Sequence, residues 1–222
     1  VHCRCAIDFA NIRAPMASIV PDPKRIRAFK TEAAFEKWLA QHHDKEPELW
    51  LQLFKKGSGV PSITAAQALD VCLCWGWIDA IRKSLDESSF LQRYVPRGKK
   101  SSWSQINREH VARLIAAGRM TPHGQKQIDA ARADGRWDAA YAPASAMTAD
   151  NIPADLRAAI EKNAAARRTL AKLDRANLFA LSFRLNALKT EAGRQRKIQS
   201  FVELLARGET LLPLSSTRRK ET

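Results

Sequence analysis

The sequence has few cysteines, no long apolar run and a shortage of acidic residues. Four cysteines in 222 residues are too sparse for the dense disulfide framework of a small secreted domain. No run reaches the roughly 18 apolar residues that a membrane-spanning helix needs. The N-terminal stretch does not look like a signal segment, because Asp8, Asn11 and Arg13 interrupt its apolar residues. We therefore expect a cytoplasmic protein without a transmembrane segment.

The sequence also lacks the usual motifs of metal sites and of nucleophilic catalysis. The five histidines form no HExxH motif and no cluster with cysteine. Cys72 and Cys74 lie two positions apart in an apolar run, and on a helix their side chains would point in different directions. The spacing shows no Ser-His-Asp or Cys-His arrangement. We therefore predict buried, inert thiols, no metal site and no cofactor.

Basic residues strongly outnumber acidic ones. The chain has 37 Lys and Arg against 23 Asp and Glu, which gives a net charge of +14 and a pI near 10.1. A surplus of this size favours an anionic partner, which we take to be nucleic acid, an acidic protein or an acidic envelope component. The hydrophobic fraction of 45% is ordinary for a globular protein and excludes wholesale disorder.

The first half of the chain mixes helical and extended patterns. Thr31 is expected to cap a helix that ends near His42. Thr64 and Gln67 have the spacing of a capping box at the start of a short apolar helix, which Gly76 ends. Three further segments have strand patterns, and we expect them to form a small antiparallel sheet. The predicted strands cover residues 48–56, 77–85 and 89–96.

The second half of the chain has a helical pattern from Ser104 onward. Ser104 and Asp174 occupy expected capping positions, and Thr121 is followed by a proline in the order that favours a helix start. The predicted fold class is therefore α+β and predominantly α-helical. It has a three-stranded antiparallel sheet in its N-terminal part and a helical C-terminal part.

Four regions follow from these patterns. Residues 1–28 are predicted to be an extension that is disordered in part, and Met16 is the predicted natural start. Deleting residues 1–15 should then leave the melting temperature unchanged. An α+β domain follows, then a helical domain and a disordered tail. Their predicted bounds are 29–118, 119–213 and 214–222.

Four motifs carry a family resemblance. They are KKGSG at Lys55–Gly59, ALDVCLCWGWID at Ala68–Asp79, QRYVPR at Gln92–Arg97 and SSWSQINRE at Ser101–Glu109. Together they resemble the YdeI or OmpD-associated family of bacteriocin-protection proteins, and the similarity extends from about Glu48 to Pro213. The resemblance implies a role in envelope stress or in tolerance of antimicrobial peptides. It implies no reaction, cofactor or catalytic residue.

The KKGSG motif is the first candidate anion site. Lys55, Lys56 and Ser58 lie beside flexible glycines, just before the helix that Thr64 is expected to cap. Backbone N–H groups can converge in such a turn, and a helix N-terminus adds positive partial charge. The motif is not a P-loop, because the pattern GxxxxGK[ST] is absent. The alternative is an ordinary strand-to-helix turn with solvated lysines.

A second candidate is the segment from Arg93 to Arg119, which contains seven basic residues and one acidic residue. Aromatic rings there could stack on bases or sugars while the cations hold phosphate. The alternative is that the aromatic residues belong to the core and the basic residues form a solvated rim. The candidate anion-binding residues are Arg93, Arg97, Lys99, Lys100 and Arg108, and the candidate stacking residues are Tyr94 and Trp103.

A third basic region covers the C-terminal helices. Between Arg157 and Arg207 there are twelve basic residues and four acidic ones. The apolar faces of these helices are needed for packing, so we expect the cations to face outward. They could follow a phosphate backbone or dock on an acidic protein or lipid surface.

Asp70 and Asp79 are the two catalytic candidates. One lies in an apolar helical run and the other at the start of a predicted strand, where a carboxylate usually pairs with an arginine. A general base would also need a substrate beside it. We therefore favour a non-enzymatic, bacteriocin-protection-like protein that binds an anionic partner through basic surfaces. The alternatives are an enzyme acting on a phosphorylated or nucleic-acid substrate, and a general nucleic-acid-binding protein.

Overall fold

A computed structural model describes residues 19–188 and 190–214, and the structural statements below concern those residues. The predictions for residues 1–15, for Met16 and for the tail beyond 214 lie outside them. The chain divides into two compact units. The first contains the described residues up to Arg97 together with Thr121–Gly124, and the second contains Gly98–Met120 and the described residues from Gln125 onward.

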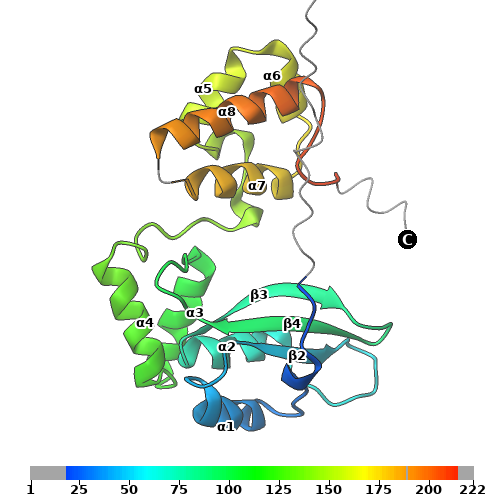
Figure 1. The fold of residues 1–222 in the computed structure, drawn as a ribbon, viewed down its shortest axis with the longest axis vertical. Coiled ribbons are helices and arrows are strands. Elements are labelled where there is room, and N and C mark those ends of the chain that lie inside the picture. The colour runs from blue at the N-terminus through cyan, green and yellow to red at the C-terminus, as the bar shows by residue number, and fades with distance from the viewer. Residues whose placement is uncertain (1–18, 189, 215–222) are drawn as a thin grey trace, which may run out of the picture. The chain divides into compact units, whose positions relative to one another are not determined.

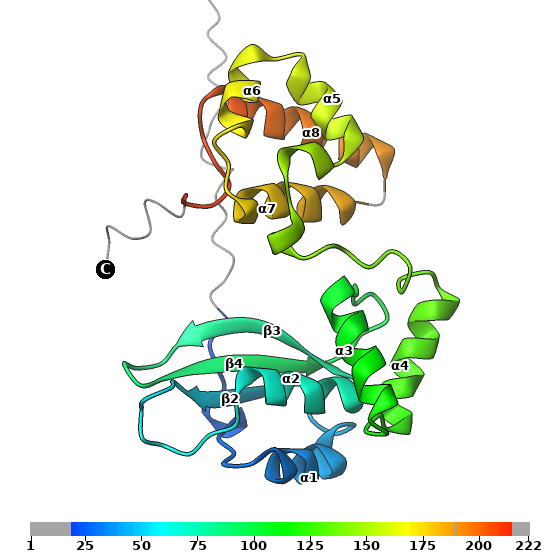
Figure 2. The same ribbon diagram turned by 180° about the vertical axis from the view of Figure 1, so that it is seen from behind.

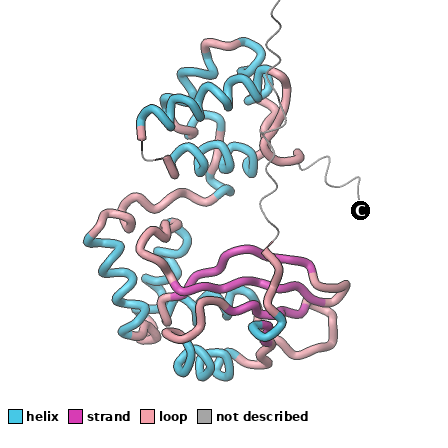
Figure 3. Tube along the Cα trace, viewed as in Figure 1, coloured by secondary structure: helices cyan, strands magenta, loops and turns pink. Residues whose placement is uncertain are grey.

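The first unit is built on a four-stranded mixed sheet (Figures 1 and 3). The strands lie in the order β1-β2-β4-β3, with β1 parallel to β2 and the other neighbours antiparallel. In the β1–β2 pair, Ile26 lies opposite Trp50. The strands are β1 (Ile26–Arg27), β2 (Leu49–Phe54), β3 (Trp77–Ser84) and β4 (Ser89–Pro96).

The prediction of a three-stranded antiparallel sheet was wrong. The three predicted segments do form β2, β3 and β4, but β1 adds a fourth strand in the parallel direction. Parallel neighbours need a crossover connection, and helix α1 (Glu32–His42) supplies it between β1 and β2. With two residues, β1 is too short to show an alternating pattern in the sequence.

Two capped helices cover one face of this sheet (Figure 2). Thr31 caps α1 by accepting a hydrogen bond from the Ala34 backbone N–H at 3.2 Å, as predicted. The predicted capping box at the start of α2 (Ala65–Cys74) is also confirmed. Gly76 follows α2 with φ of 75°, a left-handed conformation that suits glycine. The core between the helices and the sheet includes Phe35, Leu39, Leu51, Val71 and Tyr94.

The second unit is helical. The predicted caps at Ser104 and Asp174 are confirmed, because their side chains accept hydrogen bonds from the first turns of α3 and α7. Asn163 caps a separate short helix, α6, which the sequence analysis did not distinguish. The helices are α3 (Gln105–Ala116), α4 (Pro122–Ala133, whose first residues belong to the first unit), α5 (Ala154–Glu161), α6 (Ala164–Leu170), α7 (Arg175–Asn186) and α8 (Glu191–Ala206).

Helices α5 to α8 share one hydrophobic core. Leu156 and Ile160 of α5, Leu185 of α7 and Phe201 and Leu205 of α8 are among its buried side chains. Their burial leaves the polar and basic faces of these helices outside the core. Among the described residues, no helix has both the length and the apolar character that a membrane span requires.

Candidate functional site

The KKGSG turn is tied to its own surroundings. The Lys55 ammonium donates to the backbone carbonyl of Glu87 at 2.9 Å and lies 3.4 Å from that of Asp86, in the turn between β3 and β4. The N-terminus of α2 follows this turn. One of its backbone donors is already satisfied, because Thr64 Oγ1 accepts a hydrogen bond from the Gln67 N–H at 3.2 Å. Ser58 Oγ accepts a hydrogen bond from within the same loop, and Lys56 is exposed to solvent. The anion site at Lys55, Lys56 and Ser58 stays a prediction.

The arginines of the second candidate segment mostly have intramolecular contacts. Arg93 Nε lies 2.6 Å from Glu48 Oε2, and Arg97 is 6% exposed. In the second unit, Arg108 donates to the Trp137 carbonyl at 3.0 Å, and its guanidinium lies 5.2 Å from the Trp137 ring centroid. Within this candidate set, the exposed cations are Lys99 and Lys100.

The two proposed stacking residues lie in the interior. Tyr94 is 1% exposed, and its ring centroid is 6.4 Å from that of Phe35 in the core of the first unit. Trp103 is 2% exposed, and its centroid is 4.9 Å from that of Trp137 in the second unit. Neither ring is presented to solvent for stacking on a base.

Asp79 is the more interesting of the two carboxylates. It lies opposite Tyr94 in the β3–β4 pair, on the face of the sheet that α2 covers, and its side chain is exposed to solvent. Partial burial by the surrounding protein raises the pKa of the Asp79 carboxyl, while the positive charges of Arg97 and Arg82 oppose that rise. Asp70 lies half-buried on α2. The positive charges of Arg82 and Arg97 therefore both act on Asp79, in line with the expectation that such a carboxylate pairs with an arginine.

A register shift follows Asp79 along β3, between Asp79 and Arg82. The Gln92 side-chain amide faces the carbonyls of Ala80 and Ile81 in this irregular stretch, at 3.4 and 3.3 Å. Gln92 Oε1 in turn accepts a hydrogen bond from Arg82 Nε at 3.0 Å. This network fixes the position of one of the two arginines beside Asp79.

The thiols beneath this site are buried, as predicted. Cys72 and Cys74 are both buried, and neither forms a disulfide. Burial raises the pKa of the Cys72 thiol, and the negative charge of Asp79 adds to the rise. A thiol held in its protonated form is a poor nucleophile and a poor metal ligand. Across the described ranges, no group of three or more His, Cys, Asp or Glu side chains is arranged to hold a metal ion.

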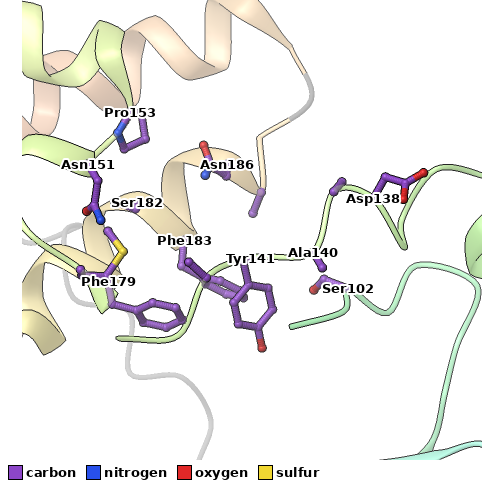
Figure 4. A pocket seen from close by; sticks show the side chains of 14 residues that line it. Ser102, Asp138, Ala140, Tyr141, Asn151, Pro153, Phe179, Ser182, Phe183 and Asn186 are labelled. Carbon is purple, nitrogen blue, oxygen red and sulfur yellow. The ribbon is translucent and has the colours of Figure 1, made fainter. Parts of the chain in front are cut away.

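The second unit contains a pocket of about 470 Å³ that the sequence analysis missed (Figure 4). Tyr141 lies on its wall with its ring centroid 5.2 Å from that of Phe183 and 5.7 Å from that of Phe179. Phe179 and Phe183 lie four positions apart on α7, which was a visible signal.

Helices α5 to α7 carry a group of uncompensated cations. Several basic residues of this unit are paired, including Arg167 with Glu161 and Arg207 with Glu209. Seven others in residues 151–208 are exposed and form no ion pair with any described residue. Three of them are Arg157, Arg184 and Arg196, and the four that lie nearest to α6 along the chain are Lys162, Arg168, Lys172 and Arg175.

Comparison with known proteins finds a different family match in each half of the chain. Residues 27–127 match a family described as a domain of unknown function, and the four motifs quoted above lie within that stretch. Residues 151–208 match the family described as Bacteriocin-protection, YdeI or OmpD-Associated. No curated protein and no solved structure matches the chain. The suspected family is thus confirmed for the C-terminal helices alone, because residues 151–208, which include α5 to α8, match the model of the bacteriocin-protection, YdeI or OmpD-associated family.

Proposed function

We propose that this protein is a non-enzymatic binding protein that engages an anionic partner through the helical domain of residues 151–208. The observation that carries the proposal is the group of exposed cations without ion pairs at Lys162, Arg168, Lys172 and Arg175. All four lie within one stretch of α5 to α7, and we call them the α6 cations. A phosphate backbone that binds such cations releases its condensed counterions, which favours association.

The local structure supports this use of the α6 cations. Ala166 and Leu170 of α6 are buried in the domain core, so the apolar side of this helix is already occupied. Arg168 lies on α6 and Lys172 lies in the turn that follows this helix, and both are exposed. The nearest acidic groups have other contacts, since Glu161 pairs with Arg167 and Asp174 caps α7. Among the described residues, no carboxylate therefore forms an ion pair with the α6 cations.

The role we propose follows the family description, which is protection against bacteriocins. The partner would be nucleic acid, an acidic protein or an acidic envelope component, and the protein would act in the cytoplasm. Nucleic acid is the partner to test first, because the salt dependence of its binding can be calculated in advance.

The experiment is a fluorescence-polarisation titration of the full chain with labelled mixed-sequence single-stranded DNA and RNA. It is run at about 50 and about 200 mM salt. The test variant replaces the four α6 cations by glutamine. The matched control replaces four exposed lysines outside this domain and so removes the same net charge. The control lysines are Lys24, Lys30, Lys37 and Lys126.

The proposal expects binding that weakens steeply as salt rises. Each cation that neutralises a phosphate contributes about 0.7 to the slope of log affinity against log salt for single strands. The test variant should therefore lose close to 3 from that slope, while the control variant keeps it. Equal effects of the two variants would mean that net charge alone acts. Absence of binding at low salt would exclude nucleic acid, and vesicles containing anionic lipid would be the next probe.

A second candidate function, an enzyme of phosphorylated substrates, rests on Asp79. Its raised pKa and its neighbours Arg82 and Arg97 are the combination that general acid–base chemistry beside an anion requires. The test is hydrolysis of p-nitrophenyl phosphate mono- and diesters. If this candidate is correct, Asp79→Asn abolishes turnover while Asp70→Asn preserves it. Turnover that is absent from the unsubstituted chain, or that is unchanged in Asp79→Asn, rules the candidate out.

A further inference from the structure

The pocket of the second unit differs in charge from the rest of the chain. Its lining contains no Lys, Arg or His, although the protein carries a net charge of +14. The single charged side chain that lines it is Asp138. Asp138 is exposed and forms no ion pair or hydrogen bond with any described residue. The pocket therefore offers a carboxylate and no positively charged side chain that would attract an anion.

The wall of the pocket is aromatic. Phe179 and Phe183 are stacked on α7 with centroids 5.5 Å apart and an interplanar angle of 24°. The Tyr141 ring packs edge-on against Phe183, with an interplanar angle of 79°. The three rings therefore do not form one continuous stack that would cover all of their faces. Phe183 is 40% exposed, and Figure 4 shows the three rings gathered in the pocket. Aromatic ring faces attract both flat apolar groups and cations.

Several polar groups of the pocket are already occupied. Ser182 Oγ donates to the Leu178 carbonyl at 2.9 Å. Asn151 donates to the Ala146 carbonyl and accepts from the Thr148 N–H, both at 2.8 Å. These internal hydrogen bonds stabilise the pocket wall. Because Ser182 and Asn151 already have partners, they do not need hydrogen bonds from a polar ligand. Recognition would come from the rings and from the Asp138 carboxylate.

We propose that this pocket binds an arylalkylamine, a small molecule in which an alkyl chain joins a flat aromatic ring system to an ammonium group. The ring system would pack against Tyr141, Phe179 and Phe183, and the ammonium group would face the Asp138 carboxylate. The volume of about 470 Å³ lies within the usual range for small-molecule sites. This site is separate from the α6 cations, and its ligand has the opposite charge to the anionic partner proposed above.

Three indole probes separate the contributions of ring and charge. Tryptamine carries an ammonium group, indole is neutral, and indole-3-acetate carries a carboxylate. Their dissociation constants for the full chain are measured by saturation-transfer NMR at about 150 mM salt, where long-range attraction is largely screened. The net charge of the protein favours the acetate, so a preference for the amine must come from the pocket. We expect tryptamine to bind about tenfold more tightly than indole-3-acetate.

Two variants and one control connect the binding to the pocket. Phe183→Ala should weaken tryptamine and indole alike by about fivefold or more, because it removes a ring face. Asp138→Asn should weaken tryptamine alone. The control, Ile115→Ala, changes an exposed apolar side chain of α3 outside the pocket and should change nothing.

Each of the other outcomes would overturn the proposal. These are no binding of tryptamine at millimolar concentration, equal affinity for the acetate, and equal losses in Ile115→Ala and Phe183→Ala. A circular-dichroism melt of Phe183→Ala checks that the chain still folds. If Phe183→Ala does not fold, Asp138→Asn alone decides, since Asp138 is an exposed side chain that has no partner among the described residues.

Discussion

The ion pair between Asp155 and Arg194 connects α5 to α8, and its removal should destabilise the helical domain. Arg194 Nη2 lies 2.9 Å from Asp155 Oδ1, and Nε contacts the other carboxylate oxygen, so the pair is bidentate. Arg194 Nη1 also donates to the Leu185 carbonyl near the end of α7, at 3.2 Å. The two side chains are 22% and 34% exposed. One guanidinium thus joins three helices.

The size of the effect follows from this geometry. A hydrogen bond to a charged group contributes ~1.5–3 kcal/mol when buried, and partial exposure lowers that value. We expect Asp155→Asn to cost about 1.5 kcal/mol, which in a region of this size lowers the melting temperature by about 6–12 °C. The hydrogen bond from Arg194 lowers the pKa of Asp155. The stabilisation is therefore present at neutral pH and is lost as the pH falls through that lowered pKa.

The assay is a thermal melt followed by circular dichroism, at pH 7 and at pH values below 4. The matched control is Glu209→Gln, which breaks the local pair of Arg207 and Glu209, whose side chains are 54% and 55% exposed. The control should cost clearly less than Asp155→Asn, because solvent screens an exposed ion pair. The difference between Asp155→Asn and the unsubstituted chain should shrink in acid. A cost at pH 7 no larger than that of the control would refute the reasoning.

Three further predictions concern other parts of the chain. Thr64→Ala removes the N-cap of α2 and should cost about 1 kcal/mol in a urea titration, while a change within error would contradict the role of the capping box. Leu185→Ala opens a cavity in the helical core and should cost ~2–5 kcal/mol in the same assay. Because the raised pKa of Asp79 means that folding disfavours its charge, stability should fall as the pH rises through that pKa. Asp79→Asn should remove this dependence and should not destabilise the chain at pH 7. The change should stay within ~1 kcal/mol, because solvent screens the exposed carboxylate, and a clear loss at pH 7 would contradict the prediction.

The sequence predicted those elements whose signals are local. Thr31 and Thr64 each cap a helix through the residue three positions later, so a short window contains the whole interaction. Strand β1 has no such window. It exists because Ile26 and Arg27 pair with Trp50 and Leu51 across the intervening helix, and two residues show no periodicity.

The candidate sites, too, depend on contacts between residues that are far apart in the sequence, and such contacts could not be predicted from local patterns. Tyr94 and Trp103 have the composition of a stacking surface, and only the packing around them shows that they are buried. The aromatic pocket depends on Tyr141 meeting Phe179 and Phe183, and those positions are far apart along the chain. The α6 cations lie in a region that the composition had identified as basic. Their freedom from ion pairs depends on where the carboxylates of neighbouring helices lie.

The position of β3 at the end of the strand order has a consequence for self-association. An edge strand offers unpaired backbone groups to other chains, and Ile81 and Leu85 are exposed apolar side chains at this edge and its adjoining turn. The register shift after Asp79 interrupts the regular ladder, and Arg82 adds charge beside it. Two copies meeting at this edge would have to align an irregular strand and bring like charges together. The edge of β3 therefore opposes the strand-to-strand aggregation that a flat, regular edge would promote.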